Sequence, residues 1–189
     1  MEHLAKIFGS PARLKTLRLF LFNQQAGFTL DEVVKRTKLA PSVARRELSE
    51  LVAAGLLRKR GARATARFQV NPNFEHLIPL DVFIRDTTSV DPRRIAALLK
   101  RAGPLRLIAL SGFFTGIIES QVDLLIVGDK LDERALAGAV RSLEAELGRE
   151  IRYASFITTD FRYRLGVYDR LLRDVFDYPH RLLIDKIGL

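Results

Sequence analysis

Signals for the start and end of helices divide the first 55 residues of the chain into short helical segments. Ser10-Pro11 fits an N-cap followed by proline at the first helical position. Thr29, with Glu32 three residues later, has the pattern of a capping box at the start of a second helix. Pro41 opens a third helix, and Gly55 fits its C-terminal cap. Two helices joined by a short turn, after an earlier helix, predict a helix-turn-helix.

The third of these helices carries a polar ridge on the side opposite its apolar residues. Four positions at i, i+3, i+4 and i+7 form this ridge: Ser42, Arg45, Arg46 and Ser49. Arginine near the start of a helix can pair bidentately with guanine in the major groove of DNA. The ridge therefore predicts a recognition helix, although a helix face that merely contacts solvent has the same composition.

A basic hairpin is predicted directly after the third helix. Residues 56–60 and 65–70 have the composition of strands, and Gly61 begins the turn between them. Five cations lie on or beside this hairpin: Arg58, Lys59, Arg60, Arg63 and Arg67. A hairpin of this kind can contact phosphates as the wing of a winged helix.

The net positive charge of the chain comes entirely from this first part. Residues 1–74 hold 14 Lys and Arg against 5 Asp and Glu, whereas residues 75–189 hold 17 of each. The formal net charge of +9 therefore belongs to the first segment. A basic segment followed by a neutral one indicates that the basic segment binds a polyanionic partner. The alternative interpretation is a basic surface that only keeps the protein in solution.

The phrase "SVARRELSELVAAGLLRKR" resembles winged-helix regulators of the arsenic-repressor and multiple-antibiotic-resistance-repressor type. The resemblance implies a winged helix-turn-helix DNA-binding domain over residues 1–74. It also implies a transcriptional regulator whose partner is double-stranded DNA and which acts as a homodimer.

The rest of the chain alternates predicted strands with predicted helices. Residues 75–92 are expected to form a linker or connecting helix. Residues 93–189 are expected to form an α/β domain with a mixed sheet. The predicted fold class is therefore α+β, with a winged helix-turn-helix followed by this second domain.

The phrase "LIALSGFFTGIIESQVDLLIVGD" resembles the nucleotidyltransferase fold of the polymerase-beta and kanamycin-nucleotidyltransferase type, and "REIRYASFITTDFRYRL" resembles its third strand and following helix. In that family a Gly-Ser pair cradles phosphate and paired aspartates hold magnesium for nucleotidyl transfer. The resemblance implies a nucleotidyltransferase-like domain over residues 93–189.

The catalytic pattern of that family is degraded in this chain. Ser111-Gly112 stands where Gly-Ser is expected, Gln121 replaces the first aspartate, and Asp123 stands alone. The third strand offers Tyr153 and Ser155 in place of a carboxylate. Because one carboxylate is a poor site for two phosphate-bound ions, we expect no enzyme activity. Asp123 would instead accept backbone hydrogen bonds.

Nucleotide binding without turnover is a separate possibility, because backbone N–H groups can still cradle a phosphate. The residues of this vestigial nucleotide site are Ser111, Gly112, Gly116 and Asp123.

Composition excludes several other functions. The chain has no Cys, and its histidines (His3, His76 and His180) lack metal-ligand spacing, so no metal site and no cofactor are expected. The longest nearly uncharged run, residues 107–122, is too short and polar to span a bilayer, and no signal peptide is apparent. A cytoplasmic protein without a membrane partner is therefore expected.

The function that these patterns favour is a DNA-binding transcriptional regulator, with a second domain that dimerises or senses a nucleotide or small-molecule effector. Two alternatives remain open: a nucleotidyltransferase-type enzyme, and an antitoxin-like interaction module.

Overall fold

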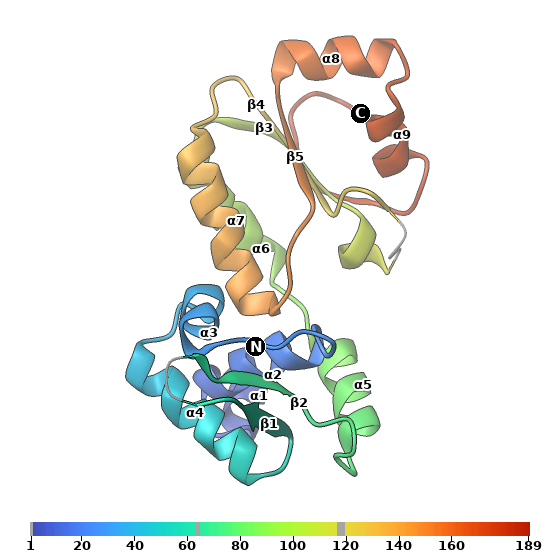
Figure 1. Ribbon diagram of the computed structural model, residues 1–189. Helices are drawn as coiled ribbons and strands as arrows, with labels where there is room; N and C mark the ends of the chain where they lie inside the picture. Colours follow the sequence, from blue (N-terminus) through green and yellow to red (C-terminus); the bar gives the residue numbers. More distant parts are fainter. Residues whose placement is uncertain (1, 63–64, 117–119) are drawn as a thin grey trace. The chain divides into compact units, whose positions relative to one another are not determined.

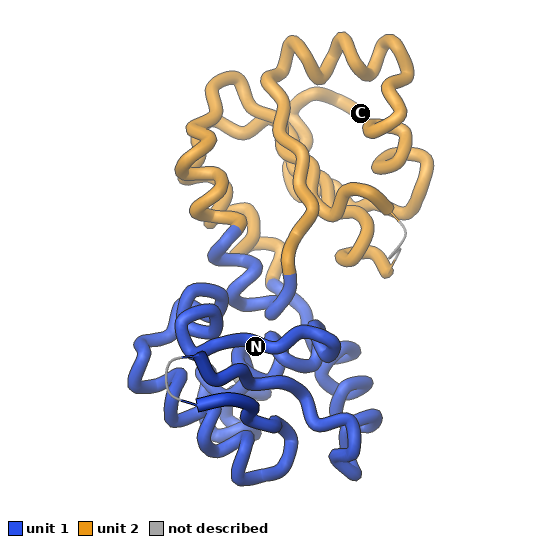
Figure 2. The backbone as a smooth tube through the Cα atoms, viewed as in Figure 1, with its two compact units in different colours: residues 1–90, 141–149 blue, residues 91–140, 150–189 orange. Residues whose placement is uncertain are grey.

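The computed structural model describes residues 2–62, 65–116 and 120–189. The chain forms two compact units (Figure 2). Unit 1 comprises residues 1–90 and 141–149, and unit 2 comprises residues 91–140 and 150–189. The second segment of unit 1 comes from within the later part of the chain, so the units do not follow one another simply along the sequence.

Unit 1 contains helices α1 to α5, the last part of α7 and a two-stranded antiparallel sheet among its described residues (Figure 1). Its elements are α1 (Glu2–Ile7), α2 (Pro11–Leu21), α3 (Leu30–Thr37), α4 (Pro41–Ala53), β1 (Leu57–Arg60), β2 (Arg67–Val70) and α5 (Leu77–Thr87). Helix α1 was not predicted from the sequence. The returning strand of the hairpin was expected from residue 65, whereas β2 begins at Arg67.

The predicted helix caps are confirmed. Ser10 Oγ accepts a hydrogen bond from the Arg13 N–H at 2.9 Å. At the start of α3, Thr29 and Glu32 form a complete capping box. Gly55 follows α4 with φ +79°, a left-handed conformation that favours glycine at the end of a helix.

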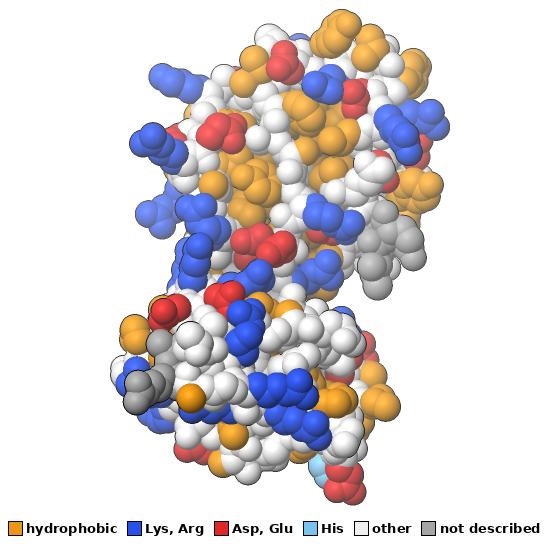
Figure 3. Space-filling view, in the orientation of Figure 1, with side chains coloured by type: hydrophobic (Ala, Val, Ile, Leu, Met, Phe, Trp, Pro, Cys, Tyr) orange, Lys and Arg blue, Asp and Glu red, His pale blue; other side chains and the backbone are white. Residues whose placement is uncertain are grey.

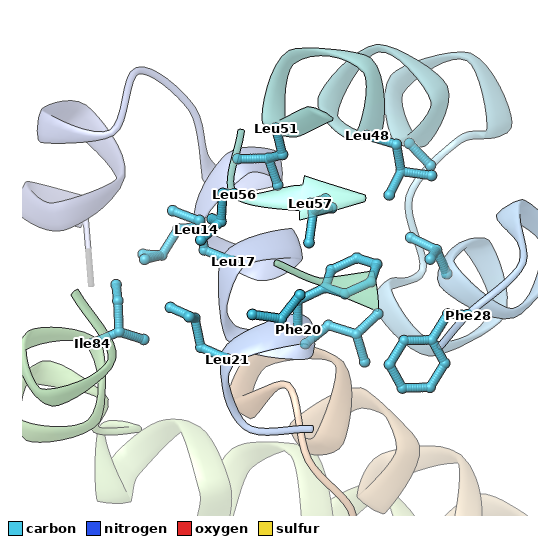
Figure 4. Close-up of a cluster of buried hydrophobic side chains, with 14 of the residues drawn as sticks. Leu14, Leu17, Phe20, Leu21, Phe28, Leu48, Leu51, Leu56, Leu57 and Ile84 are labelled. Carbon is cyan, nitrogen blue, oxygen red and sulfur yellow. The ribbon is translucent and has the colours of Figure 1, made fainter. Parts of the chain in front are cut away.

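One hydrophobic core holds unit 1 together (Figure 4). The buried side chains come from α1 to α5, from β1 and β2, and from the connecting segments. Those labelled in Figure 4 are Leu14, Leu17, Phe20, Leu21, Phe28, Leu48, Leu51, Leu56, Leu57 and Ile84. Because α2 contributes several of these residues and contacts α1, α3, α4 and α5, it is the central helix of unit 1.

Residues 141–149 are anchored to α2 by polar contacts. The buried Arg18 donates from Nη1 to the carbonyl of Glu146 at 3.0 Å, and from Nε to Thr88 Oγ1 at 3.0 Å. Asn23 Nδ2 donates to the carbonyl of Gly148 at 2.8 Å. Gly148 has φ +76°, and a Cβ there would lie 2.5 Å from the backbone of Arg18. This close approach requires glycine.

Unit 2 contains a four-stranded mixed sheet in the order β5-β4-β3-β6. Strand β3 pairs antiparallel with β4 and β6, while β4 and β5 are parallel. The elements in chain order are α6 (Pro92–Leu99), η2 (Lys100–Ala102), β3 (Leu105–Leu110), η3 (Gly112–Thr115), β4 (Leu124–Gly128), α7 (Glu133–Leu147), β5 (Tyr153–Ile157), α8 (Thr158–Gly166), α9 (Arg170–Phe176) and β6 (Arg181–Asp185). The last part of α7 belongs to unit 1. The α+β class and the mixed sheet are as predicted.

Helices cover both faces of this sheet (Figure 1). On one face, Leu107 and Leu125 pack with Phe161 of α8 and with Leu172 and Val175 of α9. Helices α6 and α7 lie on the other face. Because side chains alternate along a strand, the neighbouring residues of β3 and β4 point toward that face. In the described part of the chain, no helix is both long and apolar enough to traverse a bilayer.

Candidate functional site

Helix α4 presents the predicted ridge to solvent. Ser42, Arg45, Arg46 and Ser49 are exposed. Ala44, Glu47, Leu48 and Leu51 on the opposite side are buried. The helix therefore has one face in the core and one exposed face that carries two arginines.

Glu47 is a buried carboxylate that sequence analysis did not assign. Its side chain is 1% exposed; it binds Arg13 Nε at 2.6 Å and Arg46 Nη2 at 3.3 Å. Burial raises its pKa, but the hydrogen bonds and charges of Arg13 and Arg46 outweigh burial, so the pKa lies below its usual value. The ionised Glu47 connects α4 to the start of α2 and holds Arg46. Glu47 follows Ala44, a residue of the inward face, by three positions, and this helical spacing was the sequence signal that Glu47 is buried.

Arg45 borders a hollow between α3, α4 and the hairpin. The hollow has a volume of about 440 Å³ and is lined by Leu30, Asp31, Arg45, Leu48, Lys59, Ala66 and Phe68. Across the part of the chain that the structure describes, Arg45 forms no ion pair. Arg45 of the ridge and Lys59 of the hairpin therefore line the same hollow.

The hairpin cations do not share one surface. Lys59 pairs with Phe68 and Arg60 with Arg67 in the register of β1 and β2. Because side chains alternate along a strand, Lys59 lies on the face that borders the hollow, and Arg58 and Arg60 lie on the opposite face. Figure 3 shows Lys and Arg side chains gathered over this hairpin.

Two of the predicted hairpin cations need separate comment. The Arg67 guanidinium donates to the carbonyl of Gly27 and lies 3.4 Å from Glu32, so it is engaged within the protein. Arg63 lies outside the described residues. Three hairpin cations therefore remain exposed and form no ion pair with a described residue: Arg58, Lys59 and Arg60.

Asp123 occupies the second candidate site, at the start of β4. Its carboxylate is 1% exposed. It accepts hydrogen bonds from the Phe113 N–H at 2.8 Å and the Arg152 N–H at 3.0 Å. It also accepts from Arg152 Nη2 at 2.8 Å and Nε at 3.0 Å. The backbone hydrogen bonds expected for Asp123 are present, and Arg152 adds a counter-ion that sequence analysis missed.

Other residues of the vestigial nucleotide site also have partners within the protein. The N–H of Ser111 donates to the Asp123 carbonyl at 3.0 Å, and that of Gly116 to the Phe113 carbonyl. Gly112 has φ +50°, and a Cβ there would lie 2.4 Å from Asp123 Oδ1, so the site requires glycine at this position. The N–H groups of Ser111 and Gly116 are thus already engaged.

Asp174 of α9 binds the segment just before β4. Asp174 Oδ2 accepts from Ser120 Oγ and from the Gln121 N–H, both at 2.8 Å. Its charge also raises the pKa of Arg152, after the larger effect of the hydrogen bond to Asp123. Arg152 therefore lies near two carboxylates from different elements. No sequence motif signals Asp174, because its partners lie more than 50 residues earlier.

The acid stability of unit 2 should depend on Asp123. Burial raises its pKa, but the hydrogen bonds from the Arg152 side chain, the Phe113 N–H and the Arg152 N–H outweigh burial and hold the pKa below its usual value. Such a carboxylate stabilises the folded state fully above its unfolded pKa of about 3.9, and this stabilisation is lost as the pH falls through the folded pKa. We therefore expect a loss of stability below about pH 4 that is weaker in Asp123→Asn.

Urea unfolding at a series of pH values, followed by tyrosine fluorescence, measures this dependence. The chain has no Trp, and all its tyrosines lie in unit 2: Tyr153, Tyr163, Tyr168 and Tyr178. Equal acid dependence in the wild type and in Asp123→Asn would contradict the assignment of this effect to Asp123.

In the described ranges, His, Asp and Glu side chains do not gather in a group of three or more able to hold a metal ion. Comparisons with protein-family models, with curated proteins and with solved structures found no match.

Proposed function

We propose that the protein is a DNA-binding transcriptional regulator that inserts α4 into the major groove of double-stranded DNA. The observation that carries this proposal is the exposed ridge of α4, with Arg45 and Arg46, on the second helix of a helix-turn-helix. The β1–β2 hairpin carries three exposed cations, Arg58, Lys59 and Arg60, which suit contacts to phosphates, and Lys59 lines the same hollow as Arg45. The concentration of net positive charge in residues 1–74 supports the same function.

We further propose that unit 2 is a nucleotidyltransferase-like domain without catalytic activity. Arg152 donates to Asp123 twice through its side chain and once through its backbone, so the one carboxylate that the resemblance would assign to magnesium already has a protein counter-ion, which supports this proposal. In this proposal unit 2 forms a homodimer or senses a nucleotide or small-molecule effector. A homodimer doubles the phosphate contacts and sets the spacing of two half-sites.

The first test is a fluorescence-anisotropy titration of the protein against a random-sequence duplex at two salt concentrations. We expect binding that weakens steeply with salt, because phosphate contacts release counter-ions. A second series with ATP and magnesium should leave the affinity for DNA unchanged if nucleotide is not the effector. Absence of binding at low salt would contradict the proposed DNA-binding function.

Arg60→Ala should weaken binding to all duplexes alike. Arg60 lies on the outer face of the hairpin, so we expect it to contact phosphate and not bases. Loss of one phosphate contact should reduce the slope of log affinity against log salt by about one unit. The matched control is Arg93→Ala, which removes an exposed arginine from unit 2 and should leave the slope unchanged. A sequence-dependent loss in Arg60→Ala would instead assign base contact to this residue.

A further inference from the structure

Strand β5 forms one edge of the sheet in unit 2 and carries no charged residue. Its sequence is Tyr-Ala-Ser-Phe-Ile, over residues 153–157. Tyr153 is 37% exposed and Ile157 is 47% exposed. Proteins usually protect such edges with lysine, proline, bulges or a covering element. In Figure 1, β5 lies in front of β4 and β3, and in Figure 3 hydrophobic side chains lie on both sides of the strip where β5 runs.

The backbone of β5 offers hydrogen-bonding groups on its outer edge. Leu124 faces Tyr153 in the parallel pair, and the Leu124 N–H donates to the Arg152 carbonyl. In a parallel ladder a residue bonds to the neighbours on either side of its partner. The backbone groups of residues 152, 154 and 156 therefore point toward β4, and those of Tyr153, Ser155 and Ile157 point away from it.

We infer that the outer edge of β5 pairs antiparallel with the same strand of a second copy, about a two-fold axis at Ser155. All the outward-pointing residues then find partners: Ser155 pairs with Ser155 of the second copy, and Tyr153 pairs with Ile157 of the second copy. The Ser155 pair exchanges both backbone hydrogen bonds. In each Tyr153–Ile157 pair the Ile157 N–H donates to the Tyr153 carbonyl, because the Ile157 carbonyl is the N-cap acceptor of α8. A two-fold axis makes the interface self-complementary.

The side chains of β5 suit this pairing with itself. Tyr153 opposite Ile157 is an aromatic pair with a β-branched residue, a combination that stabilises antiparallel strands. On the other face, Ala154 comes opposite Phe156, so a small side chain meets a large one. At the ends of the strand, Arg152 comes opposite Thr158, which keeps like charges apart. This complementarity indicates a second copy as the partner, since an unrelated strand need not match the same register.

The inference deepens the proposed function, because it names the surface of the homodimer on which that function rests. It is confined to unit 2, and its test contains no DNA. A protein that forms this dimer but does not bind DNA would contradict only the proposed function. A protein that binds DNA but does not form this dimer would contradict only the inference about β5.

The test is the oligomeric state of the full chain, measured by sedimentation velocity over a range of concentrations. The wild type should dimerise, and Ile157→Lys should weaken the dimer about tenfold or more, since it places two charges in the interface. Ser155→Pro removes the central outward N–H while leaving the bonds to β4, and proline is tolerated on an edge strand; it should also weaken the dimer. Tyr163→Lys, at a residue of α8 that is 72% exposed, is the matched control and should dimerise as the wild type does.

Amide hydrogen exchange supplies the readout specific to strand pairing. In the dimer the amides of Ser155 and Ile157 should exchange slowly, and in Ile157→Lys the amide of Ser155 should exchange quickly. Circular dichroism confirms that each variant is folded. The inference is overturned by a monomeric wild type, by a dimer that persists in both β5 variants, or by fast exchange at Ser155 in the dimer. Pairing of β5 with a different protein by a monomeric chain would overturn it as well.

Discussion

Asp123→Ala should lower the free energy of unfolding of unit 2 by about 3 kcal/mol. The carboxylate is almost fully buried and accepts from two backbone N–H groups, those of Phe113 and Arg152, as well as from the Arg152 guanidinium. Alanine leaves both N–H groups without this acceptor. The Arg152 side chain is 42% exposed and can turn to water, so its own loss contributes less. Urea unfolding followed by tyrosine fluorescence measures the change in unit 2.

Three further variants separate the contributions at this site. Arg152→Ala should also destabilise unit 2, because the buried carboxylate of Asp123 loses its counter-ion. The double variant Asp123→Ala/Arg152→Ala isolates the interaction between the two side chains. Asp129→Ala, which breaks an exposed pair with Arg106, is the matched control and should have a much smaller effect. A loss in Asp123→Ala no larger than in Asp129→Ala would mean that the Asp123 contacts do not support the fold.

Much of unit 1 could be predicted because its signals are local in the sequence. The Ser10 cap, the Thr29–Glu32 capping box and Gly55 act on backbone groups within a few residues of themselves. Such short-range chemistry identifies where a helix starts or ends before tertiary packing is known. Helix α1 carries none of these caps among its described contacts, which explains why it was missed.

The parts that could not be predicted depend on partners distant in the chain. Arg18 is buried because its guanidinium binds the carbonyl of Glu146, 128 residues later. Likewise, nothing near Asp123 in the sequence identifies Arg152 as its counter-ion. Arginine is usually a surface residue, so composition and periodicity alone place Arg18 in solvent, and they do not identify Asp123 as the partner of the exposed Arg152.

The ridge residues could be predicted as exposed, but not their unequal freedom. Arg46 is restrained at 3.3 Å from the buried Glu47, whereas Arg45 borders the hollow together with Lys59. A base-reading arginine must reach the groove with both donor groups available for guanine. In the described structure Arg45 satisfies this condition better than Arg46, since Arg46 already donates to a carboxylate.

Arg45→Ala should therefore reduce affinity for a selected DNA site by about 1–3 kcal/mol, roughly 5- to 150-fold, and affinity for random duplex much less. The site is first obtained by selection from a random library with the wild-type protein, and both affinities are then measured by anisotropy. Arg93→Ala removes the same charge from unit 2 and controls for net charge. Equal losses on selected and random DNA would show that Arg45 contacts only phosphate, and a larger selective loss in Arg46→Ala would transfer base reading to Arg46 despite its bond to Glu47.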